Sequence, residues 1–89
     1  MTDRFDITLL TQDDCAFCAD AQRVLDRVGA EFPLQVKEIA LATDEGRALA
    51  TTAGVLFAPG VLIDGEPFSY GRLSERKLRR ALEKRRTNG

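Results

Sequence analysis

The sequence of 89 residues predicts a single α/β domain, residues 1–89, in which a four-stranded mixed sheet carries helices on both faces. Three observations lead to this fold class. Near the N-terminus apolar residues occupy every second position, and they then recur at helical spacing. A second strand-like segment follows. Further along, an Asp-Gly pair joins two short strands. The expected order is strand, helix, strand, helix, strand, strand, helix, with a parallel pair at the start and an antiparallel hairpin near the end.

The first half of the chain contains two expected strands around an amphipathic helix. Apolar residues occupy alternate positions in the segment from Phe5 to Thr11, which predicts a strand. The following segment has helical spacing, with Gly29 as the expected C-cap. Its predicted apolar stripe consists of Phe17, Cys18, Ala21, Val24, Leu25 and Val28. The segment from Pro33 to Ala40 is the second expected strand, and the sequence leaves its register open.

Two further helices are predicted from their capping residues. Thr43 begins a short helix that continues to about Ala53 and ends at Gly54. Ser74 caps the last helix, and residues 87–89 are expected to form a frayed tail.

A hairpin is expected between these two helices. The Asp64-Gly65 pair is a strong signal for a tight turn, so residues 61–63 and 67–70 are predicted to form its two arms. Pro67 lacks the backbone donor that a central strand needs, and the second arm is therefore expected at the edge of the sheet.

The composition is that of an ordinary globular domain, with 44% hydrophobic and 30% charged residues. The first ten residues include two aspartates and no long apolar segment, so we expect neither a signal peptide nor a membrane span. A cytoplasmic location is the expectation that follows.

The most informative feature is a pair of cysteines, Cys15 and Cys18, which are the only two in the chain. They lie where the first strand gives way to the helix. A thiol at a helix N-terminus lies at the positive end of the backbone dipole, which favours the thiolate, and its partner one turn along can reach it. By position we expect Cys15 to be the nucleophile and Cys18, on the apolar stripe, to be the resolving thiol.

The sequence offers little for a metal site. It contains no histidine, and a closed zinc site needs four ligands whereas a single CxxC motif supplies two. We expect no metal ion within the chain. The alternatives are zinc held with the help of carboxylates, and zinc or an iron–sulfur cluster ligated between two chains.

Positive charge is concentrated towards the C-terminus. Residues 1–71 hold 5 basic and 12 acidic groups, a balance of −7, whereas residues 72–89 hold 8 basic and 2 acidic groups, a balance of +6. One interpretation is a solvated helix face. The other is docking of an acidic protein partner or an anionic cofactor, with Arg72 and Arg76 nearest the site. Nucleic acid is not expected, because no aromatic residues interleave with the basic groups.

The order of elements and the motifs resemble the thioredoxin superfamily, specifically its small glutaredoxin-like and thioredoxin-like dithiol proteins. The resemblance covers Phe5 to about Leu82. Three segments carry it: Cys15-Ala16-Phe17-Cys18, Gly54-Val55-Leu56-Phe57-Ala58-Pro59 and Val61-Leu62-Ile63-Asp64-Gly65. It implies a thioredoxin-like fold.

The resemblance also implies a binding site beside the dithiol. The proline that matches Pro59 is cis in the family, and the backbone of Ala58 would then offer hydrogen bonds to an extended substrate or a thiol cofactor. Phe17 stands where glutaredoxins commonly carry Tyr or Phe. Arg72 and Ser74 lie in the segment that best matches the glutathione-binding segment of glutaredoxins. No tightly bound cofactor is implied, and glutathione or another low-molecular-weight thiol is the candidate reductant.

We therefore expect a thiol–disulfide oxidoreductase that reduces mixed disulfides of proteins or small molecules. The expected partners are a disulfide-containing protein or a small-thiol mixed disulfide, and a thioredoxin-reductase-type donor is a second candidate source of electrons. We expect a monomer that binds neither nucleic acid nor a membrane. The alternative is a binding or redox-sensing module on the same fold, without turnover.

Overall fold

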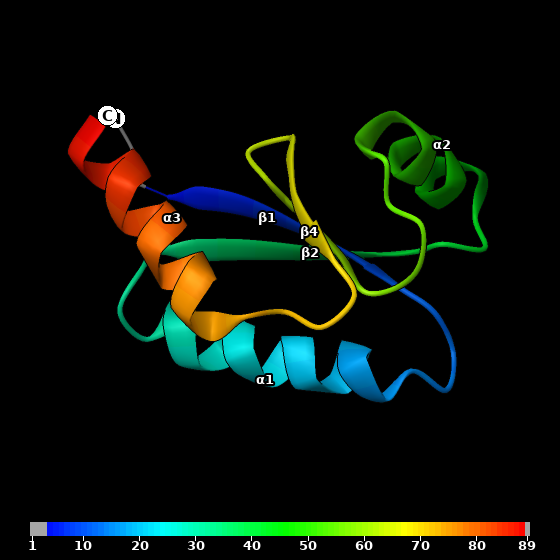
Figure 1. Cartoon of the computed structure of the whole chain (residues 1–89), viewed down its shortest axis with the longest axis horizontal. Helices are drawn as coiled ribbons and strands as arrows, with labels where there is room; N and C mark the ends of the chain where they lie inside the picture. The colour runs from blue at the N-terminus through cyan, green and yellow to red at the C-terminus, as the bar shows by residue number, and fades with distance from the viewer. Residues whose placement is uncertain (1–3, 89) are drawn as a thin grey trace.

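The computed structural model describes residues 4–88, which form four strands and three helices in the predicted order (Figure 1). The elements are β1 (Phe5–Thr11), α1 (Ala16–Gly29), β2 (Leu34–Ala40), α2 (Asp44–Ala53), β3 (Gly60–Ile63), β4 (Glu66–Tyr70) and α3 (Glu75–Asn88). Helix α3 continues two residues into the segment 87–89 that the sequence predicts to be frayed, and Gly89 lies outside the described residues. None of the three described helices is long and apolar enough to cross a membrane.

The sheet has the order β2-β1-β3-β4, with β1 and β3 in its interior. Strand β1 pairs with β2 in parallel and with β3 in antiparallel orientation, which confirms the mixed sheet. Strand β4 is an edge strand, as Pro67 predicts. Asp64 and Gly65 both have positive φ, 51° and 84°, the backbone conformation of the tight hairpin turn that their sequence predicts.

The sheet separates two hydrophobic clusters, one on each face. Phe5, Ile7 and Leu9 of β1 belong to the larger cluster, together with buried residues of α1 and α3. Leu10 points to the other face, where it packs with Ile39 and with residues of α2. Helices α1 and α3 therefore cover one face of the sheet and α2 covers the other, which confirms the prediction of helices on both faces (Figure 1).

Two expectations about α1 are wrong. Phe17 does not share the buried stripe: it is 48% exposed, because Cys18 takes the inward position of this turn and Phe17 lies about 100° further round the helix. Gly29 is not the C-cap either. Ala30 takes that position with an ordinary helical φ of −71°, and its N–H donates to the carbonyl of Arg27, so the end of the helix needs no left-handed residue.

The open register of β2 is now defined. Leu34 pairs with Phe5 and packs on the larger cluster, whereas Ile39 pairs with Leu10 and lies on the opposite face. Val36, which the sequence cannot distinguish from these two, is exposed because β2 is the other edge of the sheet.

An ion-pair network joins α1 to α3. Arg27 binds Glu75 at the start of α3, with 2.9 Å between Nη2 and Oε1, and Glu75 also binds Arg79 at 3.0 Å. Arg79 in turn contacts Glu31 just after α1. Hydrogen bonds from Arg27 and then Arg79 lower the pKa of Glu75 from its ordinary value of 4.5.

Gly46 allows α2 to pack closely on the end of β2. A Cβ atom at this position would overlap with the backbone carbonyl oxygen of Ala40. We predict that Gly46→Ala lowers the free energy of unfolding by about 1–3 kcal/mol, because this overlap outweighs the gain in helix propensity. Urea unfolding measures the change. The matched control is Ala48→Gly, on the exposed side of α2, which reports propensity alone at about 1 kcal/mol; a stabilised Gly46→Ala protein would show that the helix can shift freely.

Glu75 is predicted to stabilise the fold in a pH-dependent manner. Because its pKa is lower in the folded protein, its contribution is present above the ordinary value of 4.5 and is lost as the pH falls through the folded-state pKa. We expect Glu75→Gln to lower the free energy of unfolding at pH 7, and the difference from wild type to shrink steadily below pH 4.5. Urea unfolding across this range is the measurement. Asp26→Asn, an exposed carboxylate of α1, is the control, and a Glu75 difference independent of pH would contradict the pairing.

Candidate functional site

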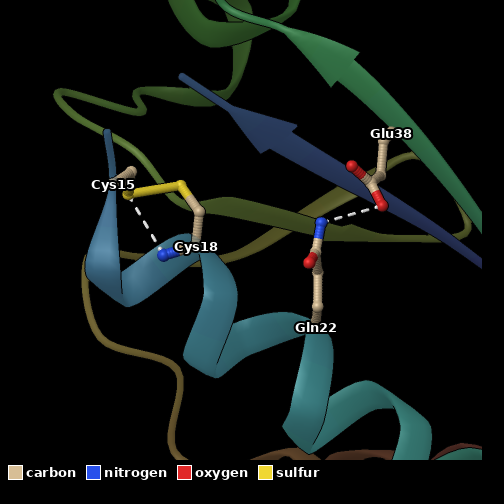
Figure 2. Close-up of a disulfide and its surroundings, with 4 residues drawn as sticks. All are labelled: Cys15, Cys18, Gln22 and Glu38. Carbon is tan, nitrogen blue, oxygen red and sulfur yellow. Dashed lines mark hydrogen bonds between the residues drawn. A yellow bond between two sulfur atoms is a disulfide. The ribbon is translucent and has the colours of Figure 1, made fainter. Parts of the chain in front are cut away.

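The sequence places Cys15 at the N-cap of α1. Strand β1 ends at Thr11, and the turn that follows includes Asp14 with a φ of 54°, a left-handed conformation that aspartate adopts more readily than most residues. Cys15 then has extended backbone angles, φ −111° and ψ 103°, immediately before the first helical residue. Its Sγ accepts a hydrogen bond from the backbone N–H of Cys18 at 3.1 Å (Figure 2). The sulfur therefore takes the role that a serine or aspartate oxygen has at other helix starts.

The two cysteines are joined by a disulfide (Figure 2). Their Cα atoms are 5.2 Å apart, within the usual range for a disulfide. Cys18 is only 5% exposed, whereas Cys15 is half-buried. The pair can therefore exist as a dithiol or as a disulfide within one helical turn, with Cys15 the more accessible of the two sulfurs.

An exposed hydrogen bond from Gln22 links the first half of α1 to the sheet. It lies four residues after Cys18, and its Nε2 donates to Oε2 of Glu38 on β2 at 3.0 Å (Figure 2). This contact was not predicted from the sequence. The sequence feature that could have indicated this contact is a polar residue four positions after a buried cysteine. This indication is weak, because no nearby residue shows which strand lies next to the helix.

The segment before β3 lies at the same end of the sheet as the dithiol. Gly60 pairs with Leu10 near the end of β1, so Pro59 is just beyond the sheet on the side where the chain leads to Cys15. The Ala58–Pro59 peptide bond is cis, and both residues are buried. The carbonyl oxygen of Pro59 accepts a hydrogen bond from the N–H of Gly71 at 2.8 Å, which ties this loop to the connection between β4 and α3.

Exposed apolar side chains adjoin this loop. Leu56 is 76% exposed, and the rings of Phe57 and Tyr70 meet edge to face with centroids 5.1 Å apart. Gly71 has a φ of 79°, and a Cβ atom there would lie 3.0 Å from the Phe57 ring, so glycine permits the close approach of the two segments. From the sequence, Phe57 is only part of a motif, and this surface is not predicted.

Arg72 and Ser74 belong to a different part of the surface. They line a groove of about 640 Å³ between the middle of α1 and the start of α3. Ser74 is the N-cap of α3, as predicted, since its Oγ accepts the N–H of Lys77 at 3.2 Å. The polar lining consists of Asp20, Arg23, Arg27, Arg72, Ser74 and Glu75, and neither cysteine is part of it.

The predicted site residues thus fall into two groups. The two cysteines and Pro59 lie at one end of the sheet, whereas Arg72 and Ser74 lie in the groove beside the same helix. Arg23 and Arg27, which line the groove, were not predicted as site residues. Each is paired with a carboxylate, Arg23 with Asp20 and Arg27 with Glu75.

Potential metal ligands do not cluster around the dithiol within residues 4–88. No group of three or more Cys, His, Asp or Glu side chains in this range is arranged to hold an ion. A metal site shared between two chains would need ligands from both.

Similarity to solved structures supports the fold. A mutant thioredoxin from Halobacterium salinarum NRC-1 has a TM-score of 0.68 and 25% identity, over 90% of this chain and 73% of that chain. An uncharacterized thioredoxin-like protein from Clostridium perfringens has a TM-score of 0.70 and 19% identity, over 94% and 72%. The holo form of glutaredoxin C1 from Populus tremula x tremuloides has a TM-score of 0.57 and 20% identity, over 92% and 78%.

The sequence itself matches one family over most of its length. No curated protein matches the chain closely enough to be compared. The model of the glutaredoxin-like domain (DUF836) family, however, matches residues 6–83, a range that includes both cysteines, Pro59 and most of α3. With its thioredoxin-like fold and its CxxC pair within disulfide distance, the chain belongs to the glutaredoxin-like domain family of the thioredoxin superfamily.

Proposed function

We propose that this protein is a thiol–disulfide oxidoreductase that reduces mixed disulfides of proteins or small molecules. One observation carries the proposal: Cys15 is the N-cap of α1, and its sulfur is bonded to Cys18 in the same turn. A structural disulfide in this position would close a very short loop and would stabilise the fold less than one that closes a long loop. Reversible chemistry at the pair is the better explanation.

The reaction proceeds by two exchanges. The Cys15 thiolate attacks one sulfur of the substrate disulfide, so that a mixed disulfide forms and the other substrate sulfur leaves as a thiolate. The Cys18 thiolate then attacks Sγ of Cys15 and releases the second substrate thiolate. Two electrons pass from the protein to the substrate, and the Cys15–Cys18 disulfide is the oxidised product. The roles follow from exposure, because the half-buried Cys15 is the more accessible sulfur.

Substrate binding is proposed to use residues from both groups of the site. Phe17, exposed between the two cysteines, is suited to contact the apolar part of a substrate. The backbone of Ala58, next to Pro59, would offer hydrogen bonds to an extended peptide or a thiol compound. Arg72 and Ser74 would bind an anionic group, since the groove that they line contains an exposed guanidinium and a helix N-terminus.

The oxidised pair must be reduced again for turnover. We propose glutathione or another low-molecular-weight thiol as the reductant, with a thioredoxin-reductase-type protein as the second candidate. A cytoplasmic location fits this cycle, because a reducing compartment returns the disulfide to the dithiol. The working unit is proposed to be the monomer, without a tightly bound cofactor.

Replacement of the resolving thiol is predicted to stop the reaction halfway. Cys18→Ser should accumulate a mixed disulfide between Cys15 and the substrate, because no internal thiol remains to release it. Incubation with a peptide disulfide, followed by intact-protein mass spectrometry under non-reducing conditions, should show one added peptide per chain, and peptide mapping should locate it at Cys15. Wild-type protein should instead release the peptide and lose two hydrogens.

Cys15→Ser is the matched control for this experiment. We expect it to form little adduct, because Cys18 is almost fully buried. Equal trapping through Cys18 would mean that the two roles are reversed. A wild-type protein that forms its disulfide but never reduces a substrate would instead favour the redox-sensing module.

A further inference from the structure

Positive charge in this chain is concentrated in α3 and the residues just before it. Residues 72–89 have a balance of +6 against −7 for residues 1–71. Several arginines of α3 have structural partners: Arg79 binds Glu31 and Glu75, Arg85 binds Glu66, and Arg86 lies 4.2 Å from the centre of the Phe32 ring. These cations are already paired within the fold.

Three further cations of α3 form a separate surface. Arg76, Lys77 and Arg80, which we call the α3 basic face, are exposed, and their side chains have no ion pair or hydrogen bond to the described part of the chain. Arg76 and Arg80 are four residues apart and so share one side of the helix, opposite the buried Leu78 and Leu82. Three like charges close together repel one another, so this surface favours an anionic partner.

The α3 basic face is within reach of a partner that is docked at the dithiol. Arg27 is nine residues beyond Cys18, about 14 Å along the axis of α1, and it binds Glu75 in the first turn of α3. A protein–protein interface of ordinary size, about 800 Å² on each partner, is roughly 30 Å across, about twice this distance along α1. The groove between α1 and α3 lies on the path between them.

We propose that the α3 basic face docks an acidic surface of the polypeptide whose disulfide this protein reduces. The inference rests on the proposed function, and it adds the class of substrate: a protein with clustered carboxylates a short distance from its reactive disulfide. Asp13, Asp14 and Asp20 flank the dithiol and repel acidic groups placed immediately beside the cysteine. The two charged regions together orient the partner, with its carboxylates towards α3.

The same observations disfavour the other polyanions. Helix α3 has no aromatic residue for base stacking, and its apolar residues Leu78 and Leu82 are buried, so it has no face to insert into a bilayer. An extended polyanion that bound α3 would also be repelled by the negative charge of the rest of the chain. The compact acidic patch of a folded protein would contact α3 without extending over that negative surface.

The test uses three synthetic peptides that share one intramolecular disulfide. A Gly/Ser spacer of six residues, up to about 20 Å long, joins it to a tail of four Glu, four Gln or four Lys. Each peptide is made with the tail on either side. Reduced protein is mixed with each peptide at low salt, and the second-order rate of protein oxidation is measured by acid quench and alkylation. We expect the Glu-tail peptide to react about tenfold faster than the Gln-tail peptide in one orientation, which is the lower end of the rate gains that electrostatic steering gives.

Paired variants locate the effect. Arg76→Glu with Arg80→Glu should abolish the preference for the Glu tail. The control is the double variant Lys37→Glu with Arg47→Glu, which changes the net charge by the same amount on the α2 side of the sheet. This variant should retain the preference for the Glu tail. Raised salt should remove the preference in the wild type. Equal rates for Glu and Gln tails at low salt, or a preference that survives in the Arg76/Arg80 variant, would overturn the proposal.

Two further arms separate this inference from the proposed function. Bis(2-hydroxyethyl) disulfide, which is small and uncharged, reports basal exchange, and a reduced protein that reacts neither with it nor with any of the peptides would refute the proposed function. Fluorescence anisotropy of a labelled Glu-tail peptide measures docking without turnover, and it should show binding that depends on Arg76 and Arg80. Tighter binding of a labelled DNA duplex through the same two arginines would overturn the proposal in favour of nucleic acid.

Discussion

The position of Cys15 as the last non-helical residue before α1 is the constraint on which the site depends. Its Sγ accepts the N–H of Cys18 and is also bonded to the sulfur of Cys18, so one atom both caps the helix and takes part in the redox pair. A donor that points at this sulfur stabilises a negative charge on it. One residue earlier the sulfur would lose this donor, and one residue later it would be inside the helix.

The sheet and its two clusters hold this helix start in place. Strand β1 is paired on both sides, and the end of β1 determines where Cys15 lies, while β3 begins beside it and brings Pro59 to the same end. The Pro59 carbonyl is bound by Gly71, so the loop before β3 and the loop before α3 are held together. The parts of the site that come from distant segments are therefore positioned by backbone pairing.

The order of elements was predictable because local chemistry marks several of the boundaries: Thr43 caps α2, and Asp64-Gly65 forms the hairpin turn. The redox pair was predictable for the same reason, as its spacing is three residues. Long-range features were not. The exposure of Phe17 depends on which side of α1 the sheet covers, and the pairing of Arg27 with Glu75 joins residues 48 apart. The need for glycine at position 46 depends on a carbonyl of another element.

The central claim is that two electrons pass through Cys15 and Cys18 of a single chain. The most direct measurement is a single-turnover reaction of fully reduced wild-type protein with a limiting small disulfide, without any other thiol, followed by alkylation and mass spectrometry. Each substrate disulfide should yield two free substrate thiols and one protein chain with a Cys15–Cys18 bond. If no chain loses its two alkylatable thiols while the substrate disulfide stays intact, or if protein becomes oxidised only as a dimer linked between chains, the account is contradicted.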